Sequence, residues 1–474
     1  MLDSLLRHGT ARTASSLQLR PYQREAIAAT VGAFAGGCDS ALLVLPTGAG
    51  KTIVFGSLAH QELPARTLIL AHRDELLTQA RDKIASITGF QPGLEKGRIR
   101  ATATDPIVVA SVQSLMRGRS IAGPRFGLCV VDEAHHAAAA SYRAVLSRLR
   151  PKHVLGVTAT PFRTDRLELS SVFKHCVYKK TLLDLINEGY LTDIKVRTLP
   201  VEIDLSKVKI KQGDYSEGDL GEALEPAIQR LAKLIAREYR HRKLLTFCPL
   251  RETSRHWTKA LRAQGLPAAH IDGDCGDRKE ILEAFANNKV RFLSNASLLT
   301  EGYDEPSIDT VLILRPTTSR TLFSQMVGRG TRLFPGKRHL LVLDPLFQAE
   351  RNNPVGIGDL VAETEGEAKI IEATMRKTKS KLSTAAKLRE QASQSMGLLK
   401  AIGAASGRPG YEKALSELSY PQGQQLSLVG KSGLPAALKA FASDIADLFS
   451  GQKKGDRGSS LKSAAWPAQK RHVR

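Results

Sequence analysis

Residues 45–52 read Leu-Pro-Thr-Gly-Ala-Gly-Lys-Thr and continue the apolar run Ala41–Leu45. Small residues at the start of a helix let consecutive backbone N–H groups point at phosphate oxygens. In such a loop, Lys51 neutralises phosphate charge and the Thr52 hydroxyl ligates Mg²⁺. The strict pattern has glycine where Leu45 stands, so a glycine-rich turn before a helix is the alternative. The stretch predicts a nucleotide phosphate loop between a strand and a helix.

A second apolar run ends in an acidic pair. Residues 130–136 read Val-Val-Asp-Glu-Ala-His-His. Asp132, at the strand end, is suited to hold Mg²⁺ through water, and Glu133 to orient and deprotonate an attacking water. A surface acidic pair is the alternative. Adjacent residues of a helix do not face one metal ion, so we expect no metal site at His135 and His136. With the phosphate loop, the pair predicts nucleoside triphosphate hydrolysis.

A third stretch lies nearly two hundred residues beyond the acidic pair and therefore in another domain. Residues 325–332 read Gln-Met-Val-Gly-Arg-Gly-Thr-Arg. We expect Arg329 and Arg332, three positions apart, to share one helical face and reach the same γ-phosphate as arginine fingers. A solvated basic face is the alternative. An NTPase that completes its site from two domains is expected to move as it hydrolyses.

The composition is that of a globular protein with a surplus of positive charge. The 474 residues are 42% hydrophobic and 24% charged, and 69 Lys and Arg against 47 Asp and Glu give a net charge of +22. Such a surplus indicates a polyanionic partner, above all nucleic acid, although a basic surface kept for solubility is the alternative.

The cysteines and the apolar runs bear on the compartment. Five scattered cysteines without a CxxC pair predict neither a zinc site nor a disulfide framework, and they favour a reducing compartment. No apolar run has the length of a membrane span. We expect a cytoplasmic protein, nucleoid-associated in a bacterium, without membrane contact. The Arg- and Ser-rich start is faintly similar to a mitochondrial presequence, but a short disordered arm is expected there.

Two series of short apolar runs alternate with amphipathic stretches. The first predicted strands are Ala41–Leu45, Thr67–Leu70, Ile107–Ala110, Leu128–Val131 and Val154–Val157. The second series has a helix over Leu220–Arg240 and strands over Lys243–Phe247, Ala268–Ile271, Val290–Leu293, Thr310–Leu314 and Leu340–Leu343. Such alternation predicts parallel sheets covered on both faces by crossover helices. Ligands bind such sheets at the carboxyl ends of the strands, where the phosphate loop and the acidic pair lie.

The three stretches, in this order, resemble those of the superfamily 2 helicases with a DEAH-type motif. Further matching stretches are residues 19–23 (Leu-Arg-Pro-Tyr-Gln), 71–76 (Ala-His-Arg-Asp-Glu-Leu), 111–115 (Ser-Val-Gln-Ser-Leu), 158–161 (Thr-Ala-Thr-Pro) and 300–306 (Thr-Glu-Gly-Tyr-Asp-Glu-Pro). The resemblance covers about residues 18–345. In this family a Pro-Thr-Gly-x-Gly-Lys-Thr loop is usual, which removes the objection to Leu45. Within this superfamily, the motif sequences are most similar to those of DNA repair, phage branch-migration and restriction-motor helicases.

The resemblance implies an α/β fold with two RecA-like parallel-sheet domains in tandem, followed by a mostly helical basic extension. The expected boundaries are a disordered arm at 1–17, an ATP-binding domain at 18–180, a connecting segment at 181–218, a second domain at 219–345, a helical accessory region at 346–449 and a disordered basic tail at 450–474.

The resemblance also implies a role for each motif residue. The nucleotide would be bound by Arg20, Gln23, Thr47, Gly48, Ala49, Gly50, Lys51, Thr52, Gly302 and Asp304. Catalysis would involve Lys51, Glu133, Gln325, Arg329 and Arg332, and Mg²⁺ would be held by Thr52 and Asp132. Coupling to nucleic acid would use His135, Thr158 and Thr160, and strand contact would use His72, Arg73, Ser111 and Gln113.

The expected function is therefore that of an ATP- and Mg²⁺-dependent DNA helicase or translocase that works as a monomer. The alternatives are an RNA helicase and a DNA-binding remodelling factor without strand separation. A binding scaffold with a degenerate motor is disfavoured, because the residues expected for hydrolysis are all in place.

Overall fold

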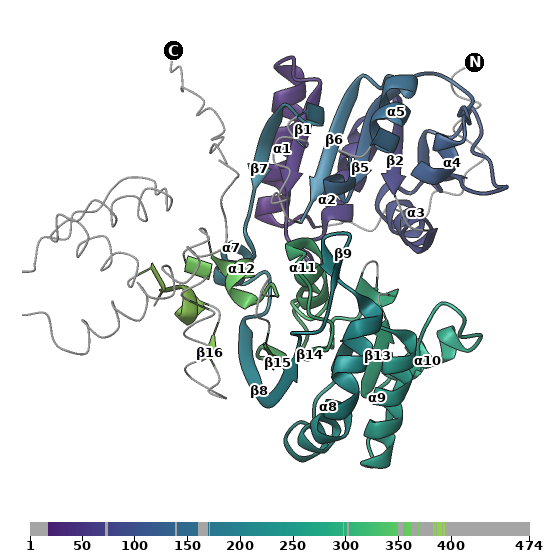
Figure 1. Cartoon of the computed structure of the whole chain (residues 1–474). Coiled ribbons are helices and arrows are strands. Elements are labelled where there is room, and N and C mark those ends of the chain that lie inside the picture. Colours follow the sequence, from purple (N-terminus) through teal and green to yellow (C-terminus); the bar gives the residue numbers. More distant parts are fainter. Residues whose placement is uncertain are drawn as a thin grey trace, which may run out of the picture. The chain divides into compact units, whose positions relative to one another are not determined.

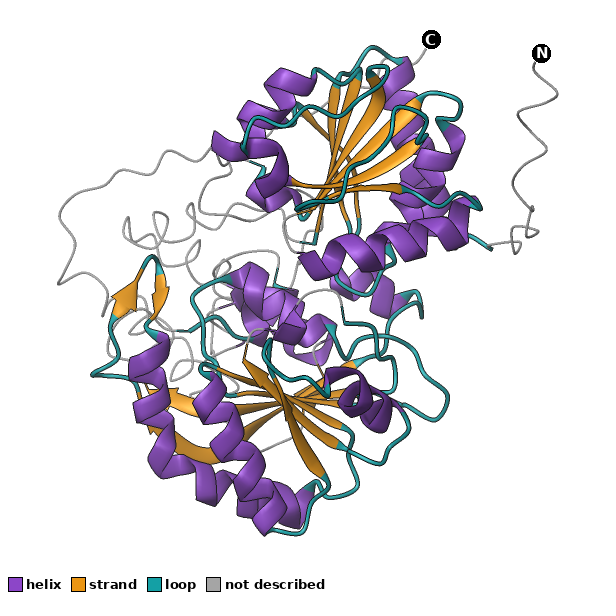
Figure 2. Ribbon diagram, turned by 90° about the vertical axis from the view of Figure 1, so that its right-hand side faces the viewer, coloured by secondary structure: helices purple, strands orange, loops and turns teal. Residues whose placement is uncertain are grey.

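The computed structural model describes residues 18–71, 74–137, 140–159, 169, 171–296, 298–300, 303–348 and 354–362, and parts of 367–393 (367–368, 371, 383–384, 386–390 and 392–393). Within these residues the chain forms two predominantly parallel sheets, one after the other in sequence (Figure 1). Helices lie on both sides of each sheet (Figure 2). The prediction of two RecA-like parallel-sheet domains is confirmed.

The first sheet has seven strands in the order β3-β4-β2-β5-β6-β1-β7, paired in parallel. The strands are β1 (Ser40–Val44), β2 (Arg66–Ala71), β3 (Gly93–Glu95), β4 (Ile107–Ser111), β5 (Phe126–Asp132), β6 (His153–Thr158) and β7 (His175–Lys179). The helices are α1 (Pro21–Ala35), α2 (Lys51–Gln61), α3 (Asp74–Thr88), α4 (Val112–Met116), the 3₁₀ turn η1 (Ala134–His136) and α5 (Ala140–Leu149).

The second sheet also has seven strands, in the order β12-β13-β11-β14-β15-β8-β16, and only β16 pairs antiparallel among those described. The strands are β8 (Ile194–Asp204), β11 (Leu244–Cys248), β12 (Ala268–Ile271), β13 (Phe292–Ala296), β14 (Thr310–Ile313), β15 (Leu340–Gln348) and β16 (Ser383–Thr384). The helices are α7 (Leu182–Asn187), α8 (Glu217–Glu238), α9 (Arg251–Ala263), α10 (Arg278–Ala286), η2 (Leu298–Thr300), α11 (Arg320–Gly328) and α12 (Ile357–Val361). A hairpin of β9 (Ile210–Lys211) and β10 (Asp214–Tyr215) precedes α8.

Each sheet has its own apolar core. Every residue of β1, β2, β4 and β11 is buried. Because helices cover both faces, these strands read as continuous apolar runs, which is why they were predictable. All ten predicted strands and the predicted helix before β11 are found, with ends shifted by up to five residues.

The segment expected to connect the domains contains regular structure. Residues 181–218 contribute β8 and the β9–β10 hairpin, and β8 pairs with β15 inside the second sheet. Buried and exposed residues alternate along much of β8, so it lacks the continuous apolar run by which the other strands were identified.

The structure describes only part of the C-terminal region for which predictions were made. The region expected to be helical contributes α12 and the edge strand β16. Residues 394–474, including the expected helix Leu434–Phe449 and the basic tail, lie outside the described residues. Among the described residues, no helix has both the length and the apolar composition needed to cross a membrane.

Candidate active site

The phosphate loop connects β1 to α2, as predicted. Gly48 and Gly50 have φ angles of +88° and +77°, in the left-handed region that favours glycine. Gly50 is the last residue before α2, so Lys51 opens the helix and Thr52 follows it. The loop thus presents backbone N–H groups at a helix N-terminus, the arrangement that binds anionic phosphate.

Helix α1 supports this loop from behind. The Tyr22 hydroxyl and the Gln23 side-chain amide both donate to the carbonyl of Ala49, across 2.7 and 3.1 Å. A Cβ on Gly50 would come within 2.8 Å of the Gln23 amide nitrogen. The Arg20 guanidinium donates to the carbonyl of Tyr190 at 3.2 Å. Arg20 and Gln23, predicted to bind nucleotide, here hold the chain around the loop.

The acidic pair lies at the carboxyl end of β5. Asp132 is the last residue of the strand, and its carboxylate accepts from the backbone N–H of Glu133 at 2.9 Å. Glu133 has φ +49°, a left-handed conformation rare for residues other than glycine. Its Oε1 is 3.3 Å from Lys51 Nζ, and its Oε2 is 3.4 Å from His135 Nδ1. Strained backbone of this kind is concentrated at functional sites.

The charge of Glu133 is set by two opposing effects. Burial alone would raise the pKa of this carboxyl group. The positive charges of Lys51 and His135, with a smaller contribution from Arg329, outweigh burial, so the pKa lies below its usual value. Glu133 is therefore ionised at neutral pH and able to accept a proton.

The coupling residues predicted from the sequence are brought together in part. Thr158 ends β6 and is fully buried, and its Oγ1 is 3.5 Å from His135 Nδ1. Its carbonyl accepts from the backbone N–H of Leu45, at the start of the phosphate loop, at 3.0 Å. Thr160 lies outside the described residues. The end of β6 therefore contacts both the phosphate loop and the turn after the acidic pair.

The prediction that Arg329 and Arg332 share one helical face is wrong. Helix α11 ends at Gly328, so both arginines follow the helix. Arg329 donates to the carbonyl of Tyr303 at 2.8 Å, whereas Arg332 forms an ion pair with Asp304 at 2.9 Å. Gly330 explains the tight exit, because a Cβ there would meet Leu340 at 2.3 Å.

The end of α11 nevertheless meets the phosphate loop. Thr331 Oγ1 lies 3.4 Å from the carbonyl of Thr47, to which it donates. A Cβ on Gly328 would come within 2.4 Å of the Thr47 side chain, and one on Gly48 within 2.9 Å of Thr331 Oγ1. Buried Arg329 is also close enough to Glu133 to affect its pKa. The segment 325–332 is thus packed against the phosphate loop.

Within the described part of the chain, two buried polar atoms of the phosphate loop and of α11 have no hydrogen-bond partner. Thr47 Oγ1 and Gln325 Nε2 form no hydrogen bond with any described residue, although both are removed from solvent. Buried polar groups in native proteins are nearly always paired, so such atoms indicate a polar ligand. With the loop glycines, Lys51 and the acidic pair, they fit a nucleotide triphosphate with Mg²⁺.

The remaining predicted positions are less informative. Ser111 ends β4, and its hydroxyl donates to the Gln113 side chain at 2.7 Å, so these two strand-contact candidates lie together. His72, Arg73 and Gly302 lie outside the described residues. Asp304 is described and mostly exposed, and its contact is the ion pair with Arg332.

The sequence did not single out several residues that shape the site. Tyr22 and Thr331 contact the phosphate loop, and Thr192 donates through its backbone N–H to the Thr331 carbonyl at 2.7 Å. Lys337 donates to the carbonyls of Pro306 and Arg332 at 3.0 and 2.8 Å. Tyr22 and Thr331 lie within stretches that were recognised. No pattern pointed to Thr192 or Lys337.

Two families of known proteins match the chain. The family described as "Type III restriction enzyme, res subunit" matches residues 16–163, and "Helicase conserved C-terminal domain" matches residues 226–333. The two matches cover the first sheet nearly to β7 and most of the second from α8 to the end of the arginine segment.

Individual relatives of the chain are also named as helicases or translocases. A Saccharomyces cerevisiae protein named as an ATP-dependent helicase, IRC3, is 31% identical over 360 residues, which are 70% of this chain and 52% of the relative. The "DNA 3'-5' translocase XPB2" of Sulfurisphaera tokodaii is 25% identical over 358 residues, covering 67% of this chain and 79% of that protein. The chain spans about half the length of the yeast relative.

A solved structure supports the fold. A fragment described as an HsdR subunit of a type I restriction enzyme from Vibrio vulnificus superposes with a TM-score of 0.54 and 24% identity, covering 71% of this chain and 70% of that fragment. Two family matches in the expected order, on two parallel sheets that join at a phosphate loop, leave one assignment: the chain belongs to the superfamily 2 helicases and translocases.

Proposed function

We propose that this protein hydrolyses ATP to move along DNA. The observation that carries the proposal is the meeting of three charged groups from distant parts of the chain. Lys51 lies 3.3 Å from Glu133, and Arg329 of the second sheet adds to the charge that keeps Glu133 ionised. An ionised carboxylate between two cations at a phosphate loop is suited to activating water for phosphoryl transfer.

Each residue has a distinct task in this proposal. Glu133 accepts the proton of the attacking water, and Lys51 exchanges its contact with Glu133 for a phosphate oxygen. Arg329 and Gln325 approach the γ-phosphate from the second sheet, where positive charge stabilises the transition state. Thr52 and Asp132 would hold Mg²⁺, which supplies further positive charge to the phosphates when bound.

Movement would follow from the contacts that join the two sheets. The end of α11 touches the phosphate loop through Thr331 and Thr47, and it touches the 303–304 segment through Arg329 and Arg332. A change at the γ-phosphate therefore acts on both ends of this segment. The contacts of Thr158 with His135 and with Leu45 offer a parallel route within the first sheet. Domain closure of this kind is a common way to convert hydrolysis into motion.

DNA is the favoured track for three reasons. The net charge of +22 supplies sequence-independent affinity for phosphate backbones. The first family match is named for a restriction enzyme, and one relative is named as a DNA translocase. The DEAH-type stretch at 132–135 is also similar to that of DNA-directed helicases. An RNA helicase is the runner-up, followed by a remodelling factor that moves on duplex DNA without separating strands.

The test is ATP turnover of the full chain with matched single-stranded, duplex and forked DNA and with single-stranded RNA. The proposal predicts stimulation by DNA that exceeds stimulation by RNA. Lys51→Ala should abolish it, whereas Lys279→Ala, which removes an exposed lysine of α10, should not. Stronger stimulation by RNA would select the runner-up. Stimulation by duplex alone, without release of a labelled strand from a fork, would select the remodelling factor.

We retain the cytoplasm as the proposed compartment and a monomer as the working unit. The support is five free cysteines and the position of the phosphate loop, the acidic pair and the arginine segment in one chain. Microscopy of the tagged chain and light scattering of the protein on DNA are the corresponding measurements.

A further inference from the structure

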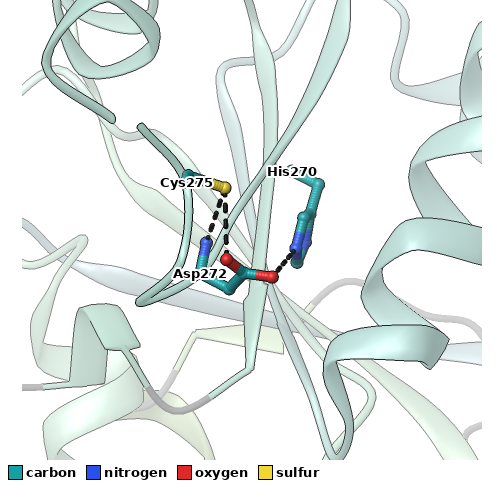
Figure 3. Close-up of side chains that lie close together, drawn as sticks. All are labelled: His270, Asp272 and Cys275. Carbon is teal, nitrogen blue, oxygen red and sulfur yellow. Dashed lines mark hydrogen bonds and ion pairs between the residues drawn. The ribbon is translucent and has the colours of Figure 1, made fainter. Parts of the chain in front are cut away.

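Three side chains with metal-binding atoms meet at the carboxyl end of β12, at the edge of the second sheet. His270 lies in β12, Asp272 follows the strand, and Cys275 lies in the turn before α10. Figure 3 shows the three side chains pointing toward one another. His270 Nε2 is 2.9 Å from Asp272 Oδ2, and Cys275 Sγ donates to Asp272 Oδ1 across 3.2 Å. One ligand atom of each lies within 4.8 Å of the other two.

Buried hydroxyl groups fix the ring of His270 from behind. Ser254 Oγ is 2.7 Å from His270 Nδ1 and donates its own proton to Ser294 Oγ at 2.9 Å. Ser254 therefore fixes the Nδ1 side of the ring, and Nε2 faces the carboxylate of Asp272. Ser254 and Ser294 are both almost fully buried, so the chain of hydroxyls holds one ring orientation. Metal-binding histidines are typically held through their second nitrogen in this way.

His270 Nε2 lies 2.9 Å from Asp272 Oδ2. A hydrogen bond between the two side chains or a metal ion bound to both of them fits this geometry. The thiol of Cys275 contacts the other oxygen of the same carboxylate. Three kinds of metal ligand therefore meet here: an imidazole nitrogen, a carboxylate oxygen and a sulfur. This donor set suits Zn²⁺.

A bound metal would require small movements of the three side chains. Bonds of about 2.0–2.3 Å in a tetrahedron place donor atoms roughly 3.3–3.6 Å apart. His270 Nε2 and Cys275 Sγ lie 2.9 and 3.2 Å from different oxygens of Asp272, and one ligand atom of each residue lies within 4.8 Å of the others. A cavity of about 610 Å³ adjoins the cluster, and His270 and Cys275 line it. Its other charged lining residues are Arg255, Lys259, Arg262, Asp277 and Glu280. The cavity gives an entry path and room for a fourth ligand.

Arg255 competes with a metal for the same carboxylate. Its guanidinium is 2.7 Å from Asp272 Oδ2, and its side chain is 58% exposed. Being at the surface, it can turn into solvent when a divalent cation takes its place.

We propose that His270, Asp272 and Cys275 bind one Zn²⁺ ion whose fourth position opens to this cavity. Bound there, the ion ties the end of β12 to the turn that begins α10. The site uses none of the residues assigned to ATP hydrolysis.

The first arm of the test compares two cysteine variants of the untagged full chain. After dialysis against Zn²⁺, the wild type and Cys176→Ser should each retain about one equivalent, and Co²⁺ should give a sulfur-to-metal charge-transfer band. Cys275→Ser should lose the band and weaken binding by more than roughly 10–100-fold, the usual cost of losing only an outer partner. Serine still has a hydroxyl to donate to Asp272, so this variant should fold.

The second arm tests the surroundings of the site. Ser254→Ala should weaken Zn²⁺ binding by roughly 10–100-fold. Arg255→Gln should strengthen it, because the competing cation is gone. Lys51→Ala should bind Zn²⁺ as the wild type does, whatever its effect on ATP. The proposal is overturned if the wild type retains no zinc, or if Cys275→Ser binds it as tightly as Cys176→Ser. The three side chains would then be held together by their hydrogen bonds alone.

Discussion

Lys51 Nζ lies 3.3 Å from Glu133 Oε1, although the two residues are 82 positions apart in the sequence. The lysine opens α2, and the glutamate follows β5 in a left-handed conformation. The charge of Lys51 helps to lower the pKa of Glu133 against the effect of burial. Any phosphate that binds Lys51 must compete with this carboxylate. In the proposed mechanism, Glu133 is then released close to the bond that hydrolysis breaks.

Replacing Arg329 by alanine should cut ATP turnover by about 10³–10⁵-fold, the range known for arginine fingers. Arg329 is buried and helps to lower the pKa of Glu133, and its proposed partner is the γ-phosphate, which ADP lacks. ADP affinity should therefore change little. Steady-state kinetics and ADP titration measure the two effects. The exposed Arg237→Ala is the matched control. Equal losses in turnover and in ADP affinity would show that Arg329 serves the fold and not the transition state.

A single methyl group at Gly328 tests the contact between α11 and the phosphate loop. A Cβ there would stand 2.4 Å from the Thr47 Cβ, so one of the two segments must move. Displacement of a catalytic group by about 1 Å can cost roughly 10²-fold in rate. Gly328→Ala should therefore lose activity without unfolding. Gly218→Ala, where a methyl group meets nothing within 4 Å, should keep it. Equal activity of the two variants would mean that this contact is not used in catalysis.

Most strands of both sheets were predictable because they are buried on both faces and so form continuous apolar runs. Among the strands that were not predicted are β7, at the edge of the first sheet, and β8, next to the edge of the second. The sequence of β7, His-Cys-Val-Tyr-Lys, is largely polar, and its residues are exposed or half-buried. In β8, buried Val201 and Ile203 alternate with exposed neighbours, a signal of period two that a search for apolar runs passes over.

The sequence motifs identified the residues of the candidate site, but they did not predict how those residues are arranged. The helix expected to carry Arg329 and Arg332 stops at Gly328, where glycines allow close packing on Thr47 and Leu340. That packing is tertiary, so no local pattern encodes it. The pairing of Lys51 with Glu133 was likewise outside the reach of the sequence, which gave each residue a separate ligand.

Lys337 should give the protein a stability that rises with pH on the alkaline side. Burial lowers its pKa from 10.5 to about 8. Between these values the unfolded chain binds more protons than the native protein, so the free energy of unfolding increases with pH. Lys337→Met should flatten this rise in thermal unfolding at about pH 7 and about pH 9.5. The exposed Lys289→Met should leave it unchanged. If the free energy of unfolding of Lys337→Met rises equally with pH, other titratable groups cause the rise.

The basic tail at 450–474 is predicted to act as a nucleic-acid tether. These residues hold seven Lys and Arg against one Asp, and Trp466 is an aromatic that can stack on a base. Each phosphate contact contributes about 0.9 to the slope of log affinity against log salt on duplex DNA. Deleting 450–474 should flatten that slope by several units and leave the maximal ATPase rate intact. An unchanged slope would mean that the tail does not bind nucleic acid.

The account as a whole depends on Glu133 acting as the base of a DNA-stimulated ATPase. The most direct measurement is ATP turnover of the full-length wild type and of Glu133→Gln, each with and without saturating single-stranded DNA, alongside ATP binding. Glutamine keeps the size of the side chain but cannot accept the proton. The account predicts that DNA accelerates the wild type, and that Glu133→Gln still binds ATP but turns it over about 10²–10⁴-fold more slowly. Near-normal turnover in Glu133→Gln, or a wild-type rate that DNA leaves unchanged, would contradict it.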